Sequence, residues 1–285
     1  MKTSLKKMQT KKKISNAVLT IILVVVALYT LFPLLFLFIN SFKGQGEIVA
    51  SPLALPSKWD LSYAKNAMNQ INIFRGLGYT LFITISSVAV LVFVSSVTAW
   101  VMVRSKSKVA NALFLAFTAA MLIPFQSVMY PLLNVMENIG LKNMGGLILM
   151  YGGFGLSLSV FLYHGFLKSV PLSLEEAAVI DGANIFQLFF KVVFPLVKST
   201  TVTVIILNAM WIWNDYLLPF LVIGNSEQKT LTLELYFART LAGQYGNPWE
   251  LIFPAVAISI IPIIILFLFL QKHIVKGVSD GAVKG

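Results

Sequence analysis

This chain of 285 residues contains no cysteine, and its only histidines are His164 and His273. The absence of cysteine excludes disulfides, thiolate metal sites and cysteine nucleophiles. Neither histidine has a second ligand at the spacing of known metal sites, so the sequence predicts no metal site. We expect His164 to be an interface residue at the end of a membrane helix.

Three motifs of common catalytic and nucleotide-binding sites are also missing. The sequence has no Gly-x-x-x-x-Gly-Lys-Ser/Thr phosphate loop, no Gly-x-Ser-x-Gly elbow and no His-Glu-x-x-His helix. We therefore predict no catalytic residues and no cofactor held by this chain. Any work driven by ATP must draw on a partner that binds the nucleotide.

Charged residues are scarce, at 12% of the chain, whereas hydrophobic residues make up 58% and the mean hydropathy is +0.83. A soluble core of this size could not bury so much apolar surface. A helix needs about 20 apolar residues to cross a bilayer core of about 30 Å. Six stretches meet this length: Val18–Ile39, Tyr79–Val103, Ala110–Leu133, Leu147–Leu167, Thr201–Ile223 and Leu251–Leu270. The expected fold class is all-α, a polytopic membrane protein with six transmembrane helices.

The basic residues predict the orientation of these spans, because loops rich in Lys and Arg stay in the cytoplasm. With the N-terminus inside, the inner segments hold fifteen of the 22 basic residues: Lys2, Lys6, Lys7, Lys11, Lys12, Lys13, Arg104, Lys106, Lys108, Lys168, Lys191, Lys198, Lys272, Lys276 and Lys284. Both termini are therefore expected in the cytoplasm. This topology accounts for the net charge of +11 without nucleic-acid binding. The lysines of the N-terminal segment can also contact anionic lipid headgroups.

Three regions follow from this layout. Residues 1–16 form a basic cytoplasmic N-terminal tail, residues 17–270 the transmembrane domain, and residues 271–285 a cytoplasmic C-terminal tail. Two outer segments are expected to contain short helices, Tyr63–Ile73 and Leu231–Leu241.

A polar segment, Ser173–Asn184, lies between the fourth and fifth apolar stretches. Ser173 and Glu176 have the spacing of a capping box at a helix start. Gly182 is expected to end this helix, and Asn184 to cap a second one that runs to the next proline. The product is a short helix-turn-helix at the inner membrane surface. From composition alone it could equally be an amphipathic connector that fills the interface.

Within residues 171–196, the strings Glu176-Ala-Ala178, Asp181-Gly-Ala183 and Phe194-Pro-Leu196 resemble the EAA loop of permease subunits of ATP-binding-cassette importers. The full string is similar to that of the carbohydrate-uptake branch, of the maltose-type inner subunit. Gly140–Asn143, Trp213–Tyr216 and the tail Gln271–Gly285 are also similar to that branch. Phe194 stands where the family more often has Leu, an apolar exchange.

This resemblance implies that the EAA loop is a coupling helix that docks on a cytoplasmic ATPase. The implied coupling residues are Glu175, Glu176, Ala177, Ala178, Asp181, Gly182 and Ala183, and the implied tail contacts with the ATPases are Gly281, Lys284 and Gly285. The implied partners are a second homologous permease subunit, two ATPase subunits that bind ATP and Mg²⁺, and an extracellular or periplasmic solute-binding protein. The implied location is a bacterial or archaeal cytoplasmic membrane.

Five residues are candidates for the substrate pathway: Gln126 in the third stretch and Trp213, Asn214, Asp215 and Tyr216 in the fifth. A carboxylate or carboxamide inside a membrane is costly, so a water-filled path is one explanation. Aromatic rings beside polar groups suit sugars. Helix packing or anchoring at the outer interface explains the same residues in the fifth stretch equally well, and Pro124 beside Gln126 is typical of a helix kink as well.

The function that these features favour is ATP-driven, binding-protein-dependent import of a sugar or oligosaccharide through this permease subunit. A polyol or glycerol-phosphate-type solute is an alternative cargo. Two other classes fit less well. An intramembrane enzyme would need an acid or a metal-ligand pair to accompany Asp215, and an ion-driven transporter would show more buried charge and an internal repeat.

Overall fold

The computed structural model describes residues 2–239 and 246–282, and within them every regular element is a helix. The chain divides into two compact units, Met1–Ile71 with Ala238–Ile258 and Asn72–Phe237 with Ser259–Gly285. In chain order the helices are α1 (Lys2–Asn40), α2 (Gln45–Ala50), α3 (Ser62–Gln70), α4 (Ile73–Ser105), α5 (Lys108–Ala120), α6 (Phe125–Asn138), α7 (Met144–Leu167), α8 (Ser173–Ile180), α9 (Ile185–Gln187), the π-helix η1 (Leu188–Val193), α10 (Phe194–Leu196), α11 (Lys198–Asn214), α12 (Leu217–Val222), α13 (Leu231–Ala238) and α14 (Trp249–Ala282). The expected all-α class is confirmed.

Four helices are long and apolar enough to cross a membrane without a break. They are Ser15–Asn40 within α1, Ile73–Ser105, Met144–Leu167 and Trp249–Phe269 within α14. The first three each contain one predicted span, and the fourth contains all of Leu251–Leu270 except its last residue. α1 begins at Lys2, so the basic N-terminal segment continues the helix of the first span.

The third predicted span, Ala110–Leu133, is wrong as a continuous helix. α5 and α6 meet at an angle of 106°, and each is too short for a bilayer core at about 1.5 Å per residue. Pro124 causes the break, because it cannot donate a backbone hydrogen bond and disfavours the helical conformation in the residue before it. Its own backbone is extended, with ψ of 141°.

The fifth predicted span, Thr201–Ile223, is also interrupted. α11 ends at Asn214, Asp215 is extended with ψ of 131°, and α12 begins at Leu217. At its other end α11 follows the helical segment Ile185–Leu196 after a bend of 76°. If each bent pair counts as one span, the described chain has up to six spans.

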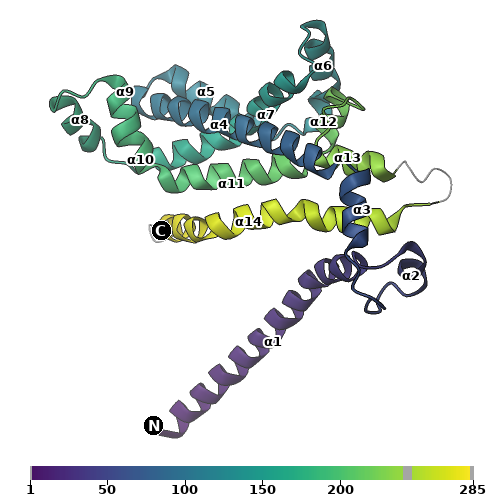
Figure 1. Cartoon of the computed structure of the whole chain (residues 1–285). Coiled ribbons are helices and arrows are strands. Elements are labelled where there is room, and N and C mark those ends of the chain that lie inside the picture. Colours follow the sequence, from purple (N-terminus) through teal and green to yellow (C-terminus); the bar gives the residue numbers. More distant parts are fainter. Residues whose placement is uncertain (1, 240–245, 283–285) are drawn as a thin grey trace. The chain divides into compact units, whose positions relative to one another are not determined.

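In the second unit, α4, α7 and α11 pack side by side (Figure 1). α8 to α10 lie at one end of this bundle, and α12 and α13 lie at the other. Small and polar residues bring the helices together, as is usual in membranes. Asn208 in α11 donates a hydrogen bond of 3.1 Å to the hydroxyl of Ser159 in α7. One helical turn away on α7, Gly155 leaves room for Asn208 and for Leu91 of α4.

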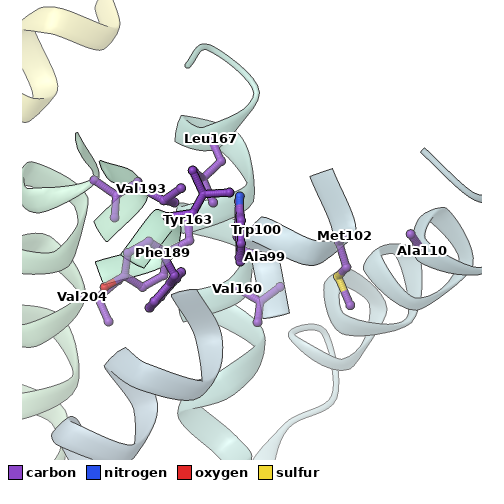
Figure 2. Close-up of a cluster of buried hydrophobic side chains, with 12 residues drawn as sticks. Ala99, Trp100, Met102, Ala110, Val160, Tyr163, Leu167, Phe189, Val193 and Val204 are labelled. Carbon is purple, nitrogen blue, oxygen red and sulfur yellow. The ribbon is translucent and has the colours of Figure 1, made fainter. Parts of the chain in front are cut away.

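A buried apolar cluster holds the end of this bundle nearest α8. Figure 2 shows Trp100, Tyr163, Leu167 and Phe189 gathered from α4, α7 and η1. The rings of Trp100 and Phe189 have their centroids 5.5 Å apart. This packing fixes the connector between α7 and α11 against the last turns of α4.

In the first unit, buried polar contacts hold the segment after α2 against the end of α1. Asn40 donates to the carbonyl of Pro52 at 3.0 Å, and the ammonium of Lys43 donates to the carbonyl of Ser51 at 2.9 Å. Both side chains are fully buried. The helix expected at Tyr63–Ile73 is present as α3.

Candidate functional site

The polar segment forms the predicted helix-turn-helix, but its first helix begins differently from the prediction. α8 has Leu172 as its N-cap, without a side-chain cap. The carbonyl of Leu172 accepts from the backbone N–H groups of Glu175 and Glu176 at 2.9 and 3.0 Å. The capping box expected between Ser173 and Glu176 is therefore wrong, because Ser173 already lies inside the helix. The carboxylates in the first turn still complement the helix dipole.

The turn after α8 has the geometry of a Schellman motif. Gly182 has φ of +84°, in the left-handed region that favours glycine. The N–H of Ala183 donates to the carbonyl of Ala178, and the N–H of Gly182 donates to that of Val179, both at 3.0 Å. A glycine is thus required here by backbone conformation, as the sequence predicted.

The second helix begins with the predicted cap. The side chain of Asn184 accepts from the N–H of Gln187 at 2.9 Å, and the Gln187 side chain accepts from the N–H of Asn184 at 3.0 Å. This is a complete capping box. The helix then widens into η1 ahead of Pro195. In an α-helix the proline ring would clash with the carbonyl four residues earlier, and the wider turn relieves that clash.

Glu175 does not face outward from this helix-turn-helix, since only 5% of its surface is exposed. Its Oε1 lies 2.7 Å from Nη2 and 2.9 Å from Nε of Arg104, and its Oε2 accepts from the indole N–H of Trp100 at 2.9 Å. Arg104 also donates to the carbonyl of Val170 at 3.2 Å. These contacts, which we call the Glu175 cluster, attach α8 to the last two turns of α4.

Sequence reasoning assigned Glu175 to coupling with the ATPase and missed Arg104 and Trp100 as its partners. These partners lie 71 and 75 residues away along the chain. The only local signal was a basic residue at the end of the second span.

Large apolar side chains on both sides of the Gly182 turn are exposed. Ile180 is 85% exposed and Phe186 is 72% exposed, and their sequence neighbours Val179 and Ile185 are also exposed. We call these four residues the apolar knob. Glu176, Ala177 and Asp181 are exposed near them, while Ala178 and Ala183 are half-buried. Large apolar side chains grouped on a polar connector are typical of a protein interface.

The residues predicted at the end of the fifth span lie together, but their contacts and exposure differ. Trp213 is buried and donates from its indole to the carbonyl of Ser259 at 3.2 Å. The carboxylate of Asp215 accepts from the hydroxyl of Tyr151 and from the N–H of Leu217 at the start of α12. Trp213 and Asp215 are thus held by structural contacts.

Asn214 and Tyr216 are exposed beside them. Tyr216 stacks on Tyr236 of α13, with ring centroids 5.8 Å apart and planes 20° apart. Trp211 is also exposed and meets Tyr151 edge to face. Sequence reasoning missed Tyr236 as a member of the aromatic surface that these exposed rings form. Among the described contacts, none joins Gln126, which is exposed in the first turn of α6, to this group.

A cavity of about 400 Å³ lies beside the break between α5 and α6. Its lining includes Ala120, Leu132, Met150 and Gly153, with Ser157 supplying a hydroxyl. Within the described chain no group of three or more His, Asp or Glu side chains could hold a metal ion. Of the predicted tail contacts, Gly281 lies in α14, and Lys284 and Gly285 lie outside the described residues.

Comparisons with known proteins agree with this architecture. Residues 91–280 match the family described as "Binding-protein-dependent transport system inner membrane component". The chain is 39% identical over 274 residues to the probable starch degradation products transport system permease protein AmyC of Thermoanaerobacterium thermosulfurigenes, covering 96% of this chain and 99% of that one. It is 35% identical over 284 residues to the multiple sugar-binding transport system permease protein MsmG of Streptococcus mutans, covering 97% and 100%.

A third relative is the melibiose/raffinose/stachyose import permease protein MelC of Bacillus subtilis, 32% identical over 273 residues, covering 95% of this chain and 98% of that one. Among solved structures, a chain of a bacterial ABC transporter that imports the acidic polysaccharide alginate has a TM-score of 0.79 and 23% identity. The similarity covers 91% of this chain and 96% of that chain, and it shows a shared fold.

Proposed function

The chain belongs to the family of binding-protein-dependent transport system inner membrane components, and we propose that it carries a sugar or oligosaccharide into a prokaryotic cell. Membership confirms the resemblance drawn from residues 171–196. It makes the chain a non-catalytic permease subunit of an ABC importer, in which ATP is bound and hydrolysed by partner ATPase subunits.

The cargo is proposed from the relatives. Their names refer to starch degradation products, multiple sugars, and melibiose, raffinose and stachyose. The exposed aromatic surface of Trp211, Tyr216 and Tyr236 supports this cargo, because aromatic faces stack on the C–H faces of sugars. Asn214 adds hydrogen-bonding groups beside it. We place the sugar path along this surface rather than against Trp213 or Asp215, whose polar groups are already engaged.

The partners are proposed in the arrangement of such importers. A second homologous permease subunit completes the path, two ATPase subunits bind on the inner side, and a solute-binding protein delivers the sugar from outside. The basic loops support an orientation with both termini in the cytoplasm of a multi-pass subunit. In that orientation α8 and α9 face the ATPases, and the ATPase contacts proposed for Gly281, Lys284 and Gly285 belong to the same side of the membrane.

The observation that carries the coupling role is the apolar knob. Val179, Ile180, Ile185 and Phe186 stand exposed around the Gly182 turn, and Glu176 and Asp181 lie beside them with charges that basic groups can meet. A buried apolar centre with a polar rim is the usual composition of a protein interface. The knob therefore docks into a cleft of the ATPase.

Replacing Ile180 with Glu tests this role, because the side chain is exposed and its loss does not disturb a core. We expect the variant to reach the membrane but to co-purify with much less ATPase and to lose sugar uptake. Val49→Glu is a matched control, since Val49 is an exposed apolar residue of a short helix, α2, in the outer segment. Normal ATPase co-purification with Ile180→Glu would contradict docking through the knob.

A further inference from the structure

Glu175 has a contact pattern that docking on an ATPase does not require. A buried carboxylate must be paired and hydrogen-bonded to be tolerated. Glu175 satisfies this demand inside the subunit, through Arg104 and Trp100 of α4. Its side chain thus holds α8 against α4, while the apolar knob is left exposed.

α4 is one continuous helix from the Glu175 cluster to the other end of the bundle. It runs for 33 residues, or about 50 Å at 1.5 Å per residue. It contains no proline. Buried residues recur from Ile73 to Met102, so one face is packed along its whole length against neighbouring helices. Such a helix moves as one body when either end is displaced.

The far end of α4 is attached to α13. The hydroxyl of Thr80 accepts from the N–H of Leu231, the first residue of α13, at 2.8 Å. Gly76 lies so close to this helix that an added Cβ would stand 3.0 Å from Cα of Leu231 and 3.2 Å from Cγ of Glu234. The backbone of α13 therefore rests directly on α4 at a glycine.

We propose that α4 links the ATPase-facing helix α8 to the outer helix α13, and that Glu175 is a positioning residue of this link. The inference rests on the proposed function, which places α8 on the inner side and α13 on the outer side. Arrival of a loaded binding protein at the outer segment displaces α13. α4 then carries the displacement to the Glu175 cluster and so to the ATPase. When the ATPase closes, the same helix carries a displacement in the opposite direction, to α13.

The inner end is tested in the whole importer, reconstituted in proteoliposomes with its binding protein and a starch-derived oligosaccharide as probe. Trp100→Phe removes the indole N–H but keeps a ring against Phe189, and Arg104→Gln removes the charge. We expect both variants to retain the ATPase subunits and basal ATP hydrolysis. Stimulation of hydrolysis by the loaded binding protein should fall, by about tenfold in Arg104→Gln, within the usual range of coupling between sites. Lys108→Gln, an exposed change of the same charge at the next helix start, is the control.

The outer end offers a matched pair of glycines in the same helix. Gly76→Ala pushes α13 away from α4, whereas Gly78 has nothing within 4 Å of an added Cβ. We expect Gly76→Ala to reproduce the loss of stimulation seen at the inner end, with the ATPase still bound, and Gly78→Ala to behave as wild type.

Two results would overturn the link. Trp100→Phe and Gly76→Ala could both keep full stimulation, or Trp100→Phe could lose the ATPase as Ile180→Glu is expected to, which would make the cluster part of the docking surface. Failure of the proposed function looks different. In that case the wild-type complex itself shows no oligosaccharide uptake, or Ile180→Glu keeps its ATPase.

Discussion

The hydroxyl of Tyr151 in α7 donates a hydrogen bond of 3.0 Å to Oδ2 of Asp215, at the point where α11 ends. Oδ1 of the same carboxylate accepts from the N–H of Leu217, and the backbone carbonyl of Asp215 accepts from the hydroxyl of Thr232. A helix break leaves backbone groups without partners, which is expensive in a membrane. Asp215 meets this need by joining α7, α11, α12 and α13.

Replacing Tyr151 with Phe should therefore destabilise the subunit. The change leaves the ring in place but removes one of two hydrogen bonds to a charged group, so we expect a loss of about 1–2 kcal/mol in the free energy of unfolding. Thermal unfolding of the purified complex in detergent measures this. Tyr130→Phe is the control, because Tyr130 is exposed in α6; equal unfolding temperatures for the two variants would contradict the role of the bond.

The close approach of α4, α7 and α11 at Gly155 gives a second prediction. A Cβ there would lie 2.5 Å from Oδ1 of Asn208 and 2.7 Å from Cδ1 of Leu91. Gly155→Ala should cost about 1–3 kcal/mol of stability, as other overpacked sites do. Gly153→Ala in the same helix meets nothing within 4 Å and should be neutral or slightly stabilising. Denaturant-induced unfolding measures the free energy of unfolding of both variants. Equal stability of Gly155→Ala and Gly153→Ala would argue against tight packing at Gly155.

The spans in α1, α4, α7 and α14 could be predicted because the number of residues in an uninterrupted apolar run gives the length of the helix that it forms. The breaks at Pro124 and Asp215 could not. Mean hydropathy does not register the direction of the chain, so a run that bends through 106° scores like a straight one. Pro124 was interpreted as a kink, and the structure shows two separate helices because the backbone of Pro124 itself is extended.

At the candidate site, local signals could be read and distant ones could not. The cap at Asn184 and the turn at Gly182 involve neighbours within five residues, so residue type and position predicted them. Spacing alone was not sufficient, because the capping box that it predicted at Ser173 is absent. The pairing of Glu175 with Arg104 depends on how α8 folds back on α4, which no periodicity reports. The same limit hid the contact between Tyr151 and Asp215, which are 64 residues apart.

The Gly182 turn gives a third prediction. A side chain there meets no neighbour within 4 Å, so the cost of substitution comes only from holding a non-glycine residue at φ of +84°, about 1–2 kcal/mol. Gly182→Val should reorient the apolar knob and reduce sugar uptake per ATP hydrolysed. Gly182→Asn should retain more uptake, because asparagine tolerates the left-handed region. Paired uptake and hydrolysis assays test this, and normal coupling in the Val variant would contradict it.

Glu234 in α13 gives a prediction about pH. It is buried against Gly76 of α4, and burial raises its pKa above the ordinary value of 4.5, while Lys229 and Arg75 act in the opposite direction. The folded state thus binds the proton more tightly than the unfolded state. The contribution of Glu234 to stability is greatest below pH 4.5 and declines as the pH rises through the raised pKa. Glu234→Gln, which stays neutral, should therefore be more stable than wild type at pH 7.5, and the difference should shrink as the pH is lowered toward 5. Unfolding temperatures of both proteins across this pH range test the direction of this effect. If the wild-type protein instead gains stability relative to the Gln variant as the pH rises, then Glu234 is stabilised as an anion, by Arg75 or Lys229.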